Sequence, residues 1–126
     1  GRAPYRSPMC WDAEAPHGAF SDTEPWVPAA CPPEGGVAQQ RGRAGSALEF
    51  QRSLIALRRE LHGPVEPVEA APGVFAFRRG VHLIAINLSD KAAPAPSHDD
   101  VLLHTRGEVR SERIAPGDGF VAIATG

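Results

Sequence analysis

The stretch "VHLIAINLS" (Val81–Ser89) decides the fold, because it is apolar at successive positions and so on both faces of an extended chain. One face would carry Val81, Leu83 and Ala85, and the other Ile84, Ile86 and Leu88. The run therefore predicts the central strand of a sheet.

Other short segments around this strand are bounded by Gly, Pro, Asp or Ser, which mark turns. They are "VFAFRR" (74–79), "DVLLHT" (100–105), "EVRSERI" (108–114) and "GFVAIAT" (119–125). "EVRSERI" is polar enough to form an edge strand, and "GDG" (117–119) predicts a turn before the last strand. Strands that follow one another across turns are typical of an antiparallel sandwich or barrel. We expect such a domain over residues 64–126.

Before the strands, "SALEFQRSLIALRRELH" (46–62) predicts a helix. Ser46 followed by Glu49 is a capping box, in which each side chain would accept an N–H of the first turn. Gly63 and Pro64 would end the helix. One apolar stripe recurs at helical spacing and is formed by Phe50, Leu54, Leu57 and Leu61, with Ile55 widening it.

Residues 1–45 are rich in proline and turn residues and show neither helical nor strand periodicity. A loop of this length is uncommon in a compact domain unless it is functional or packs against something else. It contains both cysteines of the chain, Cys10 and Cys31, which could form one disulfide. Without a CxxC pattern, reduced cysteines in a cytosolic protein are the simpler interpretation.

The composition indicates a globular chain, with 42% hydrophobic and 22% charged residues. The net charge of −2 gives no reason to expect nucleic acid or an anionic membrane as a partner. No apolar run approaches the length of a membrane span, and the start lacks the apolar core of a secretory signal. The expected location is cytoplasmic.

The opening loop contains a distinctive set of residues: Arg6, Pro8, Met9, Trp11, Asp12, Phe20, Ser21, Pro25 and Trp26. They match the pattern Arg-Thr-Pro-Met-Gln-Trp-Asp, then Gly-Phe-Ser, then Pro-Trp. In this the loop resembles α-glucosidases of the α-amylase family of glycoside hydrolases, among which oligo-1,6-glucosidase and trehalose synthase share the pattern. The helix also resembles the family's Leu-Ile-x-Leu-Arg-Arg helix, through Leu54, Ile55, Leu57, Arg58 and Arg59.

This resemblance implies a mixed α+β fragment of a larger enzyme. Residues 1–63 would be the tail of a TIM (β/α)8 barrel, with a rim loop at 1–45 and the last barrel helix at 46–62. Residues 64–126 would be a small C-terminal antiparallel β-sandwich. The family's retaining mechanism uses an Asp nucleophile and a Glu acid/base, and both would lie upstream. No catalytic residue, metal site or cofactor is therefore expected in this chain, and the missing barrel would be its partner.

Arg6 is the one residue that the resemblance marks as substrate-binding, since the matching arginine lies at the pocket rim. There a guanidinium can donate to hydroxyls of an α-glucoside oligosaccharide. The alternative is a structural arginine that pairs with loop carbonyls or a carboxylate. Trp11 and Trp26 could stack on sugar rings, but anchoring of the loop is favoured, and Met9 is expected to pack.

Carboxylates and metal-ligand types occur in the sequence without a pattern that predicts a site. Asp12 and Glu14 are close in sequence, but a catalytic pair needs facing side chains with separated pKa values. Hydrogen bonding within the turn is favoured for Asp12. Cys10, His17, Cys31 and "SHDD" (97–100) lack the paired spacings of a zinc site.

A rival hypothesis is a stand-alone β-sandwich module that binds glycan or a protein partner, with the N-terminal loop wrapped over it. It predicts that Trp11 and the helix stripe are buried. The hypothesis of a larger enzyme predicts instead that they are exposed or poorly packed in this chain.

Overall fold

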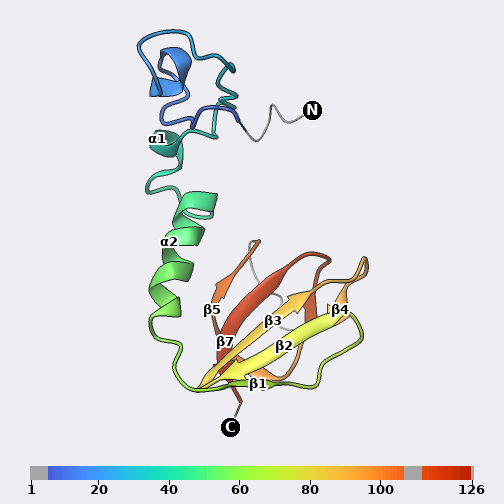
Figure 1. Ribbon diagram of the computed structural model, residues 1–126. Helices are drawn as coiled ribbons and strands as arrows, with labels where there is room; N and C mark the ends of the chain where they lie inside the picture. The colour runs from blue at the N-terminus through green and yellow to red at the C-terminus, as the bar shows by residue number, and fades with distance from the viewer. Residues whose placement is uncertain (1–5, 107–111, 126) are drawn as a thin grey trace. The chain divides into compact units, whose positions relative to one another are not determined.

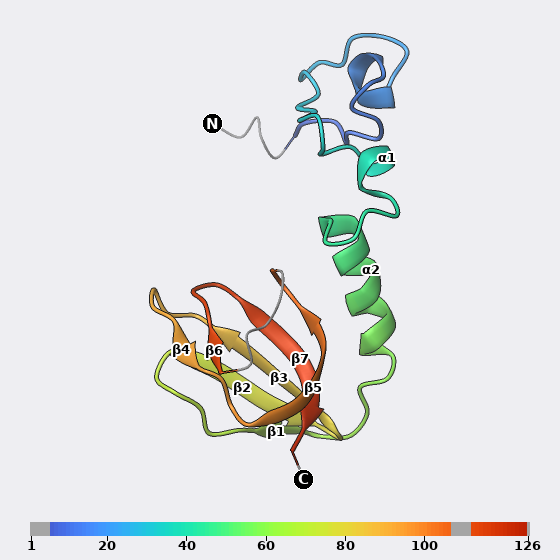
Figure 2. The same ribbon diagram turned by 180° about the vertical axis from the view of Figure 1, so that it is seen from behind.

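A computed structural model describes residues 6–106 and 112–125 of the chain (Figure 1; the reverse view is Figure 2). The chain divides into two compact units, one up to Arg52 and one from Ser53 onward. Each unit is described separately. The boundary predicted between residues 63 and 64 concerns the parent enzyme and stays a prediction.

Unit 2 contains a five-stranded sheet and a two-stranded sheet, and all strand pairs in them are antiparallel. The larger sheet has the order β1 (Val65–Pro67), β2 (Val74–Arg79), β3 (His82–Asn87), β7 (Gly119–Ala124) and β5 (His98–His104). The smaller sheet pairs β4 (Ala93–Pro94) with β6 (Arg113–Ile114). The prediction of a β-rich antiparallel domain is confirmed.

The strand β3 lies in the centre of the larger sheet, between β2 and β7, as predicted (Figure 1). Its inward face is fully covered, with Leu83 and Ala85 at 2% and 0% exposure. The opposite face is less well covered, because Ile86 on it is 37% exposed. Val81 and Leu88 lie outside the strand and are exposed. Successive side chains alternate between the faces, and the smaller sheet supplies residues to only one of them.

The core of unit 2 forms where β6 packs on the inward face of the larger sheet. Its buried members are Ala76, Leu83, Ala85, Ile114, Phe120 and Ala122, and Val68, Ala95 and Val101 are among the residues packed around them. Ile114 is the contribution of β6 to this cluster. The result is a sandwich-like domain with two layers of very unequal size.

Sequence periodicity missed β1 and β4, and it placed "EVRSERI" only in part. β1 is three residues long and exposed throughout, so it has no alternating pattern to detect. Residues 108–111 of "EVRSERI" lie outside the described residues. The described end, Arg113–Ile114, is β6, which pairs with β4 alone.

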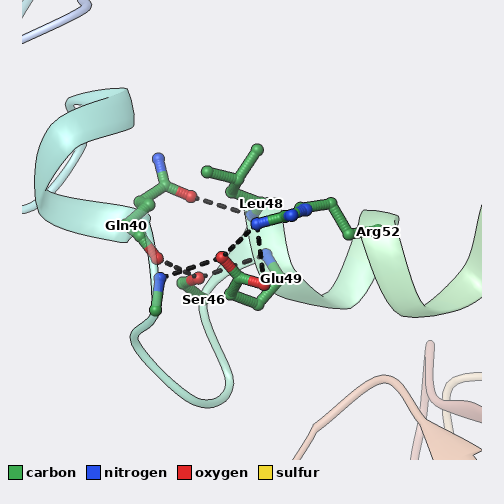
Figure 3. A network of polar contacts seen from close by, with 6 residues as sticks. Gln40, Ser46, Leu48, Glu49 and Arg52 are labelled. Carbon is green, nitrogen blue, oxygen red and sulfur yellow. Dashed lines mark hydrogen bonds and ion pairs between the residues drawn. The ribbon is translucent and has the colours of Figure 1, made fainter.

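The predicted helix is α2 (Ala47–Arg58), and its start is only half of the expected capping box (Figure 3). The Glu49 N–H donates to Ser46 Oγ at 3.3 Å, as predicted. The Glu49 carboxylate, however, accepts from the Gly42 N–H at 2.9 Å instead of from Ser46, whose N–H donates to the Arg43 carbonyl. This contact with Gly42, followed by the charge of Arg52, lowers the pKa of Glu49. The Ser46 N–H is thus already bonded within the turn before the helix, and the carboxylate bonds to Gly42 of that turn instead.

α2 also ends four residues before the predicted end at His62. The N–H groups of Arg59, Glu60 and Leu61 donate to carbonyls three residues earlier, which tightens the last turn. Gly63 then adopts φ +94°, a conformation that favours glycine. No residue of α2 is buried, so the apolar stripe of this helix lacks a complete cover.

Candidate functional site

The loop of unit 1 that carries the resemblance is closed by a disulfide between Cys10 and Cys31, whose Cα atoms lie 5.4 Å apart. The expectation of two reduced cysteines is therefore wrong. Sequence spacing indicated no contact, because 21 residues separate the two positions. The chain returns on itself through the short 3-10 segment η2 (Pro16–Ala19), which brings the two cysteines together.

Gly18 is the residue that lets the loop close around this disulfide. It is buried, adopts φ +67°, and has so little space that an added Cβ would lie 2.5 Å from Cys31 Sγ. Its carbonyl accepts the N–H groups of Trp11 and Asp12 at 2.8 and 3.1 Å. Only glycine combines the left-handed backbone with this close approach.

The short helix α1 (Val37–Gln40) fixes the motif residues from the other side. The N–H groups of Val37 and Ala38 donate to the carbonyls of Cys10 and Trp11 at 3.0 and 2.8 Å. These bonds satisfy N–H groups of the first helical turn that have no partner within the helix. The backbone of the Arg-x-Pro-Met-x-Trp motif is thus held by the disulfide, by Gly18 and by α1.

Asp12 holds the turn together, as expected from the sequence. Its Oδ1 accepts from Gln39 Nε2 at 2.7 Å and from the Glu14 N–H at 3.0 Å. Gln39 Oε1 in turn accepts from the Ala13 N–H at 3.1 Å. The Gln39 bond first, and the Glu14 bond second, lower the pKa of Asp12 below its ordinary value of 3.8. Asp12 is therefore committed to the turn and is not paired with the Glu14 carboxylate.

Replacement of Gln39 by Leu should raise the pKa of Asp12 toward its ordinary value, because the first cause of its depression is lost. A carboxyl with a depressed pKa stabilises the folded loop above its unfolded pKa. That stabilisation disappears as the pH falls through the lower, folded value. Carboxyl ¹³C NMR titration measures the pKa of Asp12 in the native chain and in the Gln39→Leu variant. Gln51→Leu, on the exposed surface of α2, is the matched control, and an unchanged Asp12 midpoint in Gln39→Leu would contradict this assignment.

Large apolar side chains of the motif are poorly covered within unit 1. Met9, Trp11, Phe20 and Trp26 are 53%, 49%, 51% and 89% exposed. Phe20 and Ser21 also line an open hollow of about 480 Å³, together with Ala15, Pro16, Ala19 and Asp22. Sequence reasoning missed this hollow, although Phe20 and Ser21 belong to the motif. Its only signal was the turn now seen as η2 (Pro16–Ala19), of which Pro16 and Ala19 line the hollow.

Arg6, the predicted substrate-binding residue, is exposed. It forms no hydrogen bond or ion pair with another residue in the ranges 6–106 and 112–125. The structural alternative, in which Arg6 pairs with a loop carbonyl or carboxylate, has no such contact among these residues.

Among residues 6–106 and 112–125, no three His, Cys, Asp or Glu side chains gather as a metal site would need. Likewise, none of the described helices has both the length and the apolar character to cross a membrane.

Comparison with known proteins gives a likeness in structure. No family model matches the chain, and no curated protein matches it in sequence. A mutant of isomaltulose synthase from Erwinia rhapontici NX5, solved with its natural substrate sucrose, is similar over 97% of this chain, with a TM-score of 0.73 and 21% identity. The α-glucosyl transfer enzyme XgtA is similar over 95%, with a TM-score of 0.69 and 28% identity.

A third neighbour, a family GH13_31 enzyme, is similar over 97% of this chain, with a TM-score of 0.77 and 18% identity. The chain spans only 24–25% of the length of these three neighbours. Its structural neighbours are thus enzymes of the GH13 α-amylase family, and the likeness is confined to a quarter of each.

Proposed function

We propose that this chain is the C-terminal portion of an α-glucosidase-like glycoside hydrolase, of the oligo-1,6-glucosidase and trehalose synthase type. The parent enzyme acts on α-glucosidic bonds of oligosaccharides, and this portion is accessory and not catalytic alone. One observation carries the proposal: the structural likeness runs through nearly the whole chain but through only a quarter of each GH13 neighbour.

In this proposal the catalytic Asp and Glu belong to the preceding barrel. Retaining glycosidases place the two carboxyl groups about 5 Å apart on either side of the bond that is cleaved. The loop at residues 1–45 completes the rim of that pocket, and the helix at 46–62 completes the barrel wall. The β domain then braces the barrel from outside.

Exposed apolar side chains in both units support the proposal that each unit packs against a partner. In unit 1 these are the exposed motif residues Met9, Trp11, Phe20 and Trp26. In unit 2 they include Phe75, which is 55% exposed on the sheet face opposite the core and contacts Phe77 at 5.6 Å between ring centroids. Contiguous exposed apolar groups mark interaction surfaces, and the barrel is the partner that we propose for them.

Arg6 contributes to substrate binding in this parent enzyme, where its guanidinium donates to sugar hydroxyls at the pocket rim. We expect Arg6→Ala to lower kcat/KM for an α-glucoside oligosaccharide by about tenfold to a hundredfold. This is the effect expected from the loss of one or two charge-assisted hydrogen bonds. Steady-state kinetics of the parent enzyme provide the measurement. Arg6→Lys should recover part of the loss, because lysine keeps the charge without the planar fork.

The matched control is Arg106→Ala, which removes another exposed arginine. Arg106 lies in unit 2, and its Nε lies 3.3 Å from Asp118 Oδ1. It should leave kcat/KM unchanged. If Arg6→Ala behaves like Arg106→Ala, Arg6 has no role at the substrate.

The proposal as a whole is tested by the mass of the native product, detected with an antibody against this chain. We expect a band about four times heavier than the chain, since the chain spans 24–25% of its neighbours, and α-glucosidase activity in the captured material. A band at the mass of the chain alone would reject the catalytic context.

A further inference from the structure

One end of the sandwich in unit 2 is hollow, and strand geometry explains why. Glu66 on β1 is in register with Arg78 on β2, and Arg78 is in register with Leu83 on β3. Arg78 lies two residues from the buried Ala76 and so faces inward, because side chains alternate along a strand. At this end of the inward face the core is thus replaced by a charged pair.

The hollow has a volume of about 200 Å³, and its lining combines apolar and polar residues. The apolar lining includes Leu83, Val68 and Ala124. The polar lining consists of two pairs. Arg78 Nη2 lies 3.3 Å from Glu66 Oε2, and the hydroxyls of Ser97 and Thr125 lie 3.1 Å apart. An apolar base with a few convergent polar groups is the usual composition of a small-ligand site.

The polar groups restrict the charge and the size of a ligand. Glu66 and Arg78 carry opposite charges, so the pair has no net charge to favour an anion or a cation, whereas a neutral ligand can hydrogen-bond to both groups. The carboxylate accepts hydrogen bonds, the guanidinium donates them, and the hydroxyls do either. The volume is below the ~300–1,000 Å³ typical of sites for drug-sized ligands.

We propose that this hollow binds one neutral sugar ring, as a free monosaccharide or as the end of a saccharide chain. The ring places its C–H face on the partly exposed Val68 and Ala124, and its hydroxyls bridge Glu66, Arg78, Ser97 and Thr125. This site is separate from Arg6 and from the hollow of unit 1. The failure of this proposal can be told apart from the failure of the proposed function. The native-mass experiment measures the length of the chain, whereas the titration below measures sugar binding.

The test is NMR titration of the ¹⁵N-labelled 126-residue chain with methyl α-D-glucopyranoside. We expect saturable shifts at the amides of Glu66, Ser97 and Thr125, with a millimolar Kd, because a single ring covers little surface. Sorbitol carries similar hydroxyls without a ring and should not saturate the same amides. Glucuronate should bind no more tightly than the neutral sugar, because the Glu66–Arg78 pair has no net charge to favour an anion.

Variants assign the binding to this hollow. Glu66→Gln and Arg78→Gln should each raise Kd by about tenfold, since each removes a charged hydrogen-bonding partner. The control is Glu34→Gln, which breaks another exposed ion pair, to Arg43 at 2.7 Å in unit 1, and should leave Kd unchanged. Thermal unfolding checks that all three variants fold. The proposal is overturned if no shift saturates, if shifts fall instead at Ala15–Asp22, or if Glu66→Gln and Arg78→Gln match Glu34→Gln.

Discussion

Asn87→Ala should lower the thermal midpoint of unit 2 by roughly 15 °C, which corresponds to about 3 kcal/mol in a domain of this size. Asn87 is completely buried. Its Nδ2 donates to the carbonyls of Lys91 and Ile114 at 2.7 and 2.8 Å, and its Oδ1 accepts the N–H and hydroxyl of Ser89 at 2.9 and 2.7 Å. Alanine would leave a cavity and a buried Ile114 carbonyl without this donor.

The size of this effect comes from the position of Asn87 between the two sheets. The side chain connects the end of β3 to β6, and its own carbonyl accepts the N–H of Gly117 in the turn before β7. Differential scanning calorimetry measures the midpoint. Asp90→Ala, an exposed residue of the same turn, should change it by no more than a degree or two. A midpoint for Asn87→Ala close to that of Asp90→Ala would show that the network contributes little.

The double variant Cys10→Ala/Cys31→Ala should destabilise unit 1 by about 3 kcal/mol while leaving the midpoint of unit 2 unchanged. The reason lies in the core. All buried hydrophobic residues of the described ranges belong to unit 2, and those buried in unit 1 are Gly18, Gly36 and Ser46. A small unit without an apolar core depends on a cross-link.

Hydrogen exchange at the amides of Trp11 and Ala38 provides the measurement, because Trp11 donates to Gly18 within the cross-linked loop and Ala38 donates to the Trp11 carbonyl of that loop. Their exchange should be at least about a hundredfold faster in the double variant. Thiol labelling of the unreduced chain is the companion experiment. Uptake of two labels without reductant would show that the disulfide is absent, and unchanged exchange would show that it contributes no stability.

The elements that sequence analysis found are those whose own residues carry the information. β2 matches "VFAFRR" at both ends, and β3 is central, because apolar residues alternate or persist along them. β1 exists only because β2 offers it an edge to pair with, so its residues reveal nothing alone. The Asn87 network was missed for a similar reason, since its partner Ile114 is 27 residues away.

The candidate site was predictable as a motif but not as a geometry. The resemblance singled out Arg6 and the motif residues around Trp11, and turn chemistry gave the role of Asp12. The disulfide was not predicted, because cysteine spacing does not report which turns bring two positions together. The Gly18 backbone, at φ +67°, decides this contact, and glycine at that position was the signal that sequence reasoning did not use.

The two outer strands of the larger sheet also bear on how unit 2 behaves at high concentration. β1 is short and ends in Pro67, which has no N–H to offer a neighbouring strand. β5 shifts register twice along its pairing with β7 and carries Asp99 and Asp100, both exposed. Short length, proline, bulges and charge are the features by which sheets avoid edge-to-edge addition. Crowded copies of this chain should therefore resist growth into extended β-assemblies, even though one face of the sheet remains apolar.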